Sequence, residues 1–226
     1  MDNINCSAVI VAGGMGRRMK SKTEKQFLML SGEEILIHTV KNISKSKYIK
    51  EITVVTVSDK IDYTKKLLSA FPKVKNIVSG GETRAQSVKN GLSAVSENCG
   101  IVLIHDGVRP FIEEKFTNNC IEDAFKFGSA VLGVIPTNTI SVTDEQGNIK
   151  ETLKRSSLVS VQPPQCFKRE IIMEAYDKFS PMCTDDASQV IRLGKTVHIT
   201  EGSPKNIKIT TPEDMIIAQE YIKDFG

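Results

Sequence analysis

The sequence predicts an α/β fold in which a mostly parallel, twisted sheet is flanked by helices. Short runs rich in β-branched residues alternate with amphipathic segments, which is the pattern of strands joined by crossover helices. The 226 residues suit a compact core that buries most of the surface of the unfolded chain. No repeat or Pro/Gly/Ser-rich linker divides the chain, so we predict one domain over residues 1–226.

The predicted elements follow one another along the chain. Strands are predicted at residues 8–11, 51–57, 76–79, 101–105 and 130–135. Helices are predicted at residues 35–43, 84–95, 113–127, 169–179 and 212–222. The last helix has a well-marked start, because Thr211 suits an N-cap and Pro212 suits the first helical position. A further short strand is predicted at residues 206–208.

One segment interrupts this alternation and predicts a β-hairpin. Two short β-branched runs, residues 139–143 and 149–153, flank a turn that contains Gly147. This arm, at about residues 137–156, either projects from the domain and packs on a partner subunit or lies on the sheet of its own chain.

Composition argues against several classes of protein. The net charge of +3, from 30 basic and 27 acidic residues, is too balanced to indicate nucleic-acid binding. No apolar run approaches the roughly 20 residues of a membrane span, and the N-terminus has no signal-peptide pattern. The 5 cysteines are scattered and never spaced C-x-x-C, which favours reduced thiols over disulfides or a zinc site. These features predict a cytoplasmic protein.

The first strand runs directly into a glycine-rich turn at residues 12–19. Glycines at Gly13, Gly14 and Gly16 let backbone N–H groups approach an anion closely. The turn has no Walker pattern, and Met19 stands where a dinucleotide-binding turn has its third glycine. The turn therefore predicts phosphate binding of another kind.

Cationic side chains accompany these glycines, at Arg17, Arg18 and Lys25. When the α-phosphorus of a nucleoside triphosphate is attacked, negative charge builds on its oxygens and on the departing pyrophosphate. Fixed cations stabilise that charge more than they stabilise the ground state. The alternative is that these residues are solvated cations around an ordinary turn.

Several motifs occur together in a fixed order. They are the glycine turn with Lys25-Gln26, then residues 80–88, 105–110, 162–165, 184–188 and 206–214. In this order they resemble the 2-C-methyl-D-erythritol 4-phosphate cytidylyltransferases, and the related ribitol-5-phosphate cytidylyltransferases share them. The resemblance spans nearly the whole chain.

The resemblance implies a glycosyltransferase-A-like nucleotidyltransferase fold, a homodimer joined through the β-arm, and Mg²⁺ bound mainly through the phosphates of CTP. Arg18 and Lys25 would be catalytic and stabilise the transition state. The positions around CTP would be Ala12, Gly13, Gly14, Gly16, Gly81, Arg84 and Ser87. The acceptor would be held by Asp106, Gly107, Arg109, Arg155, Thr184 and Lys208, with Thr139 as a further substrate-binding position.

The residues around Asp106 agree with these roles. Asp106 follows the apolar strand at 101–105, and open α/β sheets bind ligands at the carboxyl ends of their strands. A carboxylate there can bind a metal or orient acceptor hydroxyls, so Asp106 is a candidate metal ligand; alternatively it is a turn or N-cap residue. His105 is expected to be structural, because a phosphate oxygen is already ionised at neutral pH and needs no base. Arg155 ends the hairpin, so it is placed to reach a partner's site.

We therefore predict in-line attack by the acceptor phosphate on the α-phosphorus of CTP, with release of pyrophosphate. The acceptor side departs from the methylerythritol pattern, because Pro163 replaces a threonine that helps line the acceptor pocket in that family. Residues 108–111 look more like the ribitol branch, and residues 84–88 like the methylerythritol branch. We favour methylerythritol phosphate, with ribitol 5-phosphate as the alternative. An NAD-dependent dehydrogenase and a non-catalytic nucleotide-binding module are more distant alternatives.

Overall fold

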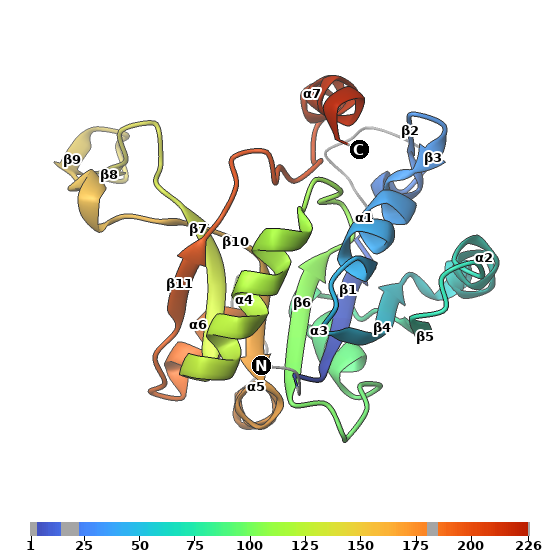
Figure 1. The fold of residues 1–226 in the computed structure, drawn as a ribbon. Coiled ribbons are helices and arrows are strands. Elements are labelled where there is room, and N and C mark those ends of the chain that lie inside the picture. Colours follow the sequence, from blue (N-terminus) through green and yellow to red (C-terminus); the bar gives the residue numbers. More distant parts are fainter. Residues whose placement is uncertain (1–3, 15–22, 180–184, 226) are drawn as a thin grey trace.

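The structure, a computed structural model, describes residues 4–14, 23–179 and 185–225 (Figure 1). Its centre is a seven-stranded sheet in the order β11-β7-β10-β6-β1-β4-β5. The strands are β1 (Cys6–Ala12), β4 (Ile49–Thr56), β5 (Val74–Ser79), β6 (Ile101–Asp106), β7 (Ser129–Val134), β10 (Ser160–Lys168) and β11 (His198–Glu201). β10 pairs antiparallel with both β6 and β7, and the other pairings in the sheet are parallel. The predicted mostly parallel sheet is confirmed.

Helices cover both faces of this sheet and make a three-layer structure (Figure 1). Successive side chains of a strand point to opposite faces, so Ala8 and Ile10 of β1 lie in one apolar cluster and Val9 lies in another. The first cluster is shared with α1 (Ile35–Ser44) and α4 (Glu114–Phe127). The second is shared with α3 (Arg84–Leu92), α5 (Arg169–Lys178) and α6 (Asp186–Arg192).

The last helix, α7 (Pro212–Asp224), closes one end of the molecule as the sequence predicts. The Thr211 side chain accepts a hydrogen bond from the backbone N–H of Asp214, and the Asp214 carboxylate accepts one from the N–H of Thr211, which is a capping box. Tyr221 of α7 and Phe225 just beyond it pack edge-to-face on the buried ring of Phe111. This contact holds α7 against the segment that follows β6.

The smaller elements connect these layers. α2 (Ile61–Leu67) lies beside β5. β2 (Met29–Leu30) pairs with β3 (Glu33–Glu34), which directly precedes α1 in the sequence. The sequence did not indicate α2, α6, β2, β3, β10 or β11. In the described part of the chain, no helix has the length and apolar character that crossing a membrane requires.

The predicted hairpin is present as β8 (Ser141–Thr143) and β9 (Ile149–Thr152). The two strands form a separate sheet that projects from the body of the domain (Figure 1). Gly147 in its turn has a φ of +86°, a conformation that favours glycine. The arm therefore does not lie on the sheet of its own chain, and it exposes Ile140, Val142 and Ile149.

Candidate active site

The described chain contains a cavity of about 600 Å³ at the carboxyl ends of the parallel strands β1, β4, β5 and β6. This is the edge of an open α/β sheet at which ligands bind. Its walls are the residues that follow each strand. The lining residues are Val11, Ala12, Gly13, Gly14, Lys25, Gln26, Val57, Ser58, Gly80, Gly81, Glu82, Thr83, Arg84, Ser87, Asp106, Val108 and Lys208.

Lys25 reaches this cavity because its neighbour is anchored to β1. The Gln26 side chain is buried and donates a hydrogen bond of 2.6 Å to the carbonyl oxygen of Ala12. This bond holds the short 3₁₀ helix Lys25–Phe27 against the end of β1. Lys25 and the first two glycines of the turn thus line one cavity, as predicted, whereas Gly16 and Arg18 lie outside the described residues.

A second wall is made of backbone, at the start of α3. The hydroxyl of Ser87 accepts a hydrogen bond from the N–H of Gly81 and donates one to the carbonyl of Thr83. A Cβ atom on Gly81 would lie 2.1 Å from Cγ of Gln86, so only glycine fits there without rearrangement. The predicted CTP positions Gly81, Arg84 and Ser87 are therefore neighbours in the cavity wall.

Asp106 is the carboxylate around which three cationic side chains gather at the cavity. Its side chain is 9 % exposed, yet it contacts cations from three segments of the chain. Its Oδ2 lies 2.9 Å from Nζ of Lys208 and 3.7 Å from Nε of Arg109, and its Oδ1 lies 3.2 Å from Nε of Arg84. Burial acts to raise the pKa of Asp106, but the charges of Arg84, Lys208 and Arg109 outweigh it and hold the pKa well below its usual value. Asp106 is therefore ionised at neutral pH.

Arg84 joins Asp106 to a second buried carboxylate that the sequence reasoning did not assign. Its two terminal nitrogens donate to both oxygens of Asp186, at 3.1 and 2.8 Å. Burial would lower the pKa of Arg84, but the adjacent Asp186 and Asp106 carboxylates more than offset it and raise the pKa. The hydroxyl of Tyr176 donates to Asp186 over 2.6 Å. The only sequence signal for Asp186 was its place in the motif at residues 184–188.

Lys208 lies in irregular backbone, so the strand predicted at 206–208 is wrong. The N–H groups of Asn206 and Ile207 donate back to the carbonyls of Ser203 and Lys205, as in turns, and the N–H of Ile209 donates to the carbonyl of Val108. Arg109 also donates to the carbonyl of Asn206, at 2.6 Å. These bonds tie the segment to the loop after β6 and leave no ladder partner for a strand.

His105 occupies a structural position, as expected. It is fully buried, and its Nε2 donates to the carbonyl oxygen of Arg109 over 3.0 Å. Burial lowers the pKa of His105 to about 4, so the ring is neutral at physiological pH. A neutral, enclosed imidazole supports the loop that carries Arg109.

The remaining predicted positions have three outcomes. Gly107 is buried beside the cavity and donates its N–H to the carbonyl of Val11, which ties the loop after β6 to β1. Thr139 and Arg155 are exposed at the base of the β-arm and do not line the cavity. Thr184 lies outside the described residues.

Asp106 is also the candidate metal ligand. In residues 4–14, 23–179 and 185–225, no group of three or more His, Cys, Asp or Glu side chains could hold a metal ion. Mg²⁺ in nucleotide sites is commonly held by one or two carboxylates together with phosphate oxygens and water. A single ionised Asp106 fits that kind of site and does not fit a metal site made of protein ligands alone.

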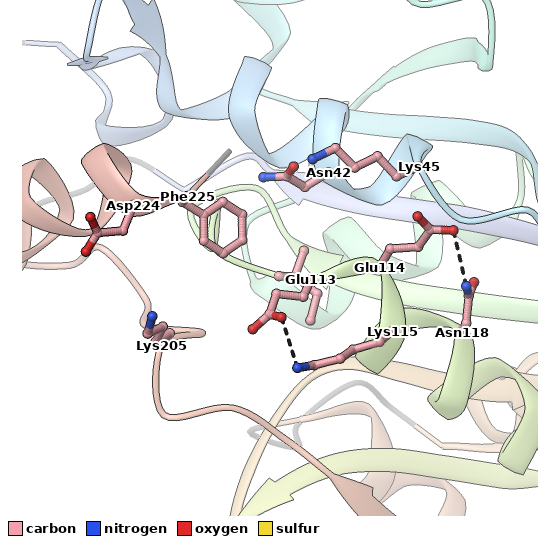
Figure 2. Close-up of a pocket in the computed structure, with 10 residues that line it drawn as sticks. Asn42, Lys45, Glu113, Glu114, Lys115, Asn118, Lys205, Asp224 and Phe225 are labelled. Atoms are coloured by element: carbon pink, nitrogen blue, oxygen red, sulfur yellow. Dashed lines mark hydrogen bonds and ion pairs between the residues drawn. The ribbon is translucent and has the colours of Figure 1, made fainter.

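A second cavity, of about 590 Å³, lies where α1 ends and α4 begins, near the end of α7 (Figure 2). Two of its acidic groups contact neighbours on the same helix or just before it: Lys115 lies 3.1 Å from Glu113, and Asn118 donates to Glu114 (Figure 2). None of the residues predicted from the sequence to bind substrate lines this cavity. The first cavity is therefore the candidate active site.

Comparison with known proteins shows the family to which the chain is similar. A profile of the family described as 2-C-methyl-D-erythritol 4-phosphate cytidylyltransferase matches residues 6–224. A protein of that name from Clostridium botulinum (strain Loch Maree / Type A3) is 41% identical over 222 residues, covering 96% of this chain and 97% of its own. One from Clostridium acetobutylicum is 42% identical over 226 residues, covering 97% and 98%.

Solved structures with the same architecture are also found. The 4-diphosphocytidyl-2C-methyl-D-erythritol synthase from Anaerococcus prevotii superposes with a TM-score of 0.88 at 30% identity, covering 98% of this chain and 97% of that one. The 2-C-methyl-D-erythritol 4-phosphate cytidylyltransferase from Thermus thermophilus has a TM-score of 0.77 at 26% identity, covering 97% of this chain and 100% of its own. The predicted fold is thereby confirmed over nearly the full length.

Proposed function

This chain belongs to the 2-C-methyl-D-erythritol 4-phosphate cytidylyltransferase family, and from that premise we propose how its residues carry out the reaction. The chain is a CTP-dependent nucleotidyltransferase that makes 4-CDP-2-C-methyl-D-erythritol and pyrophosphate in the non-mevalonate pathway. Membership favours methylerythritol phosphate over ribitol phosphate, and a nucleotidyltransferase over a dehydrogenase or a non-catalytic module. One observation carries the residue assignment: Lys25, Arg84 and Lys208 line a single cavity with the glycine turn.

We assign the CTP side to the glycine turn, Lys25 and the backbone wall at Gly81 and Ser87. The acceptor's phosphate oxygen attacks the α-phosphorus in line, and pyrophosphate leaves from the opposite side. Lys25 stabilises the charge that grows on the phosphate oxygens during this exchange, since its position beside the turn is set by Gln26. The predicted partner in this role, Arg18, lies outside the described residues.

We assign the acceptor side to Asp106, Lys208 and Arg109. The two cations suit the phosphate of methylerythritol phosphate, and the ionised Asp106 suits its hydroxyl groups. The attacking oxygen is already ionised, so the neutral His105 has no proton to accept. Magnesium, when bound, would add positive charge beside the triphosphate, with Asp106 as its protein ligand.

Replacing each lysine in turn tests the two sides separately. Lys25→Ala should lower kcat by about 100-fold or more, because it removes a cation placed at the developing charge. Lys208→Ala should instead raise the KM for methylerythritol phosphate and leave the KM for CTP near its normal value. Lys65→Ala, which removes a largely exposed lysine on α2, serves as the control. Pyrophosphate release gives the rates, and near-normal turnover of Lys25→Ala would contradict its role.

We further propose that the enzyme is a homodimer joined through the β-arm. An isolated two-stranded hairpin is marginally stable in water, and this one exposes Ile140, Val142 and Ile149. A second copy of the chain would cover these side chains and bring Arg155 toward a neighbouring site. Sedimentation of Ile149→Ser should show monomer where the parent chain shows dimer, and an unchanged dimer would refute the arm's role.

We also propose a cytoplasmic location and small-molecule substrates alone. Cys6, Cys99, Cys120 and Cys166 are buried free thiols in the described chain, which suits a reducing compartment. The net charge of +3 suits small anionic substrates in a local basic cavity more than nucleic acid. Cell fractionation and a salt-dependent nucleic-acid binding assay test these two points.

A further inference from the structure

We propose that Asp186 and Tyr176 are positioning residues for acceptor binding, and that they act by holding Arg84 against Asp106. The inference rests on the proposed acceptor role of Asp106 and Lys208. Neither Asp186 nor Tyr176 lines the cavity, so both act through another residue. The contacts form one continuous series from α5 to the segment before α7.

The series begins with buried residues of α5 and α6, on the face of the sheet opposite to α1 and α4. Tyr176 is 2 % exposed and Asp186 is fully buried. Asp186 is the first residue of α6, and that helix start is tied to the central strand β10 because the Gln165 side chain accepts a hydrogen bond from the N–H of Ala187, at 2.9 Å. Asp186 is therefore fixed in place by packing and by the backbone of its own helix.

From this base the contacts reach the cavity through Arg84. The guanidinium meets Asp186 with both terminal nitrogens, which is the bidentate arrangement that fixes an arginine in plane and direction. The remaining Nε–H then points to Asp106 at 3.2 Å. Because the guanidinium is planar, the orientation set by Asp186 also sets where the Nε–H lies.

Asp106 in turn orients Lys208, because the Lys208 Nζ lies 2.9 Å from the Asp106 Oδ2. Arg84 contributes charge in a second way: without Asp186, its positive charge would face Lys208 and Arg109 with Asp106 as the sole counter-charge among the contacts described. Asp186 balances the charge of Arg84 from the side away from Asp106, so that the Asp106 carboxylate can hold Lys208 and Arg109 in place. The Tyr176 hydroxyl in turn satisfies the Asp186 oxygen that also accepts from Arg84.

Tyr176→Phe is the mildest test, since it removes one hydroxyl and keeps the ring. A hydrogen bond to a charged group is lost, so we expect the KM for methylerythritol phosphate to rise about tenfold, and the KM for CTP, which Arg84 is also predicted to contact, to rise less. Tyr48→Phe is the matched control. Tyr48 is also buried and also donates to a carboxylate, Glu122, but it lies away from the cavity. The Tyr48→Phe substitution should leave the KM values for methylerythritol phosphate and for CTP unchanged.

A double-mutant cycle tests the route through Arg84. If Asp186 acts through Arg84, then Asp186→Asn should weaken acceptor use in the parent enzyme and have little further effect in an Arg84→Ala background. Additive effects of the two substitutions would overturn the inference. An acceptor KM that Tyr176→Phe leaves unchanged would also overturn it.

Lys208→Ala separates this inference from the proposed function. If Lys208→Ala raises the acceptor KM and Tyr176→Phe does not, the positioning role alone is refuted. If neither variant raises it, the proposed acceptor site fails together with the inference. If both variants raise the acceptor KM, and the effects of Asp186→Asn and Arg84→Ala on it are less than additive, the whole series of contacts is supported.

Discussion

Replacing Asp106 with asparagine should destabilise the folded enzyme by about 3 kcal/mol, because it removes the negative charge that three cations share. Removing one member of a buried ion pair costs about 3 to 5 kcal/mol. We expect the lower end here, since Arg84 keeps Asp186 and the Lys208 side chain is 35% exposed, so that water compensates part of the loss. Asparagine is close in shape to aspartate, so packing changes little.

Urea unfolding followed by far-ultraviolet circular dichroism measures this effect, because the chain has no Trp for fluorescence. The pKa of Asp106 is lower in the folded state than the ordinary value of about 3.9, so its contribution is present above that pH and is lost as the pH falls through the folded pKa. The difference between the parent and Asp106→Asn should be constant from about pH 5 to pH 7 and should shrink below about pH 4.

Asp62→Asn provides a control, because Asp62 is 97% exposed and pairs with Lys65 on the surface of α2. Its removal should cost no more than about 0.5 kcal/mol. If Asp106→Asn and Asp62→Asn unfold with the same midpoint at pH 7, the reasoning about Asp106 as a shared counter-charge is refuted.

Three further predictions concern the scaffold around the site. Gly91→Ala should destabilise the protein by about 1 to 3 kcal/mol, since its Cβ would lie 2.5 Å from Val9 and 2.8 Å from Val55, whereas Gly100→Ala, whose nearest neighbour is 3.7 Å away, should change the free energy of unfolding little. Thr211→Ala should lower the free energy of unfolding by about 1 kcal/mol through loss of the α7 cap, and an unchanged thermal midpoint would contradict this. The imidazole of His105 should stay neutral down to about pH 4 in an NMR titration. Because its folded pKa lies below the unfolded value of about 6.5, His105 favours the folded state above that pH and loses this effect as the pH falls toward its folded pKa; titration near pH 6.5 in the folded enzyme would refute the burial argument.

Much of the site follows from sequence because of one topological fact. The predicted strands that become β1, β4, β5 and β6 are parallel, and parallel strands present their carboxyl ends at one edge of a sheet. Motifs that are separated by dozens of residues therefore meet there. Glycines directly after β1, the Gly80–Gly81 pair after β5 and Asp106 at the end of β6 line one cavity for this reason, although the sequence placed Gly81 there only through the family resemblance.

β10 shows why part of the sheet escaped prediction. Proline lacks a backbone N–H and argues against a central strand, yet β10 contains Pro163 and Pro164 and lies between β6 and β7. The pairing of β10 with β7 shifts register between Gln162 and Gln165, so the two prolines fall where the ladder is interrupted. A strand that is possible only with such an irregularity leaves no regular pattern in the sequence.

The pairing of Arg84 with Asp186 could not be predicted for a different reason. The two residues are 102 positions apart, and α6, which carries Asp186, is a short helix on the opposite face of the sheet from α4. No spacing rule joins them. The resemblance assigned Arg84 to CTP, a role that stays a prediction, but only the folded arrangement shows that its charge is divided between two buried carboxylates.

The arrangement around Asp106 also reverses what simple charge counting predicts for substrate affinity. Asp106→Asn removes a negative charge from a site proposed to bind a phosphate, so counting charges predicts tighter acceptor binding. The contacts predict the opposite. Two unit charges of like sign at about 4 Å repel by about 4 kcal/mol at an effective dielectric constant of about 20. Arg84, Arg109 and Lys208 come from separate segments, and Asp106 lets them stay together before any substrate arrives. Without it the flexible Lys208 would turn toward solvent, and acceptor binding would have to offset the cost of bringing it back. A higher KM for methylerythritol phosphate in Asp106→Asn would therefore exclude charge counting, and a lower one would refute the preorganisation argument.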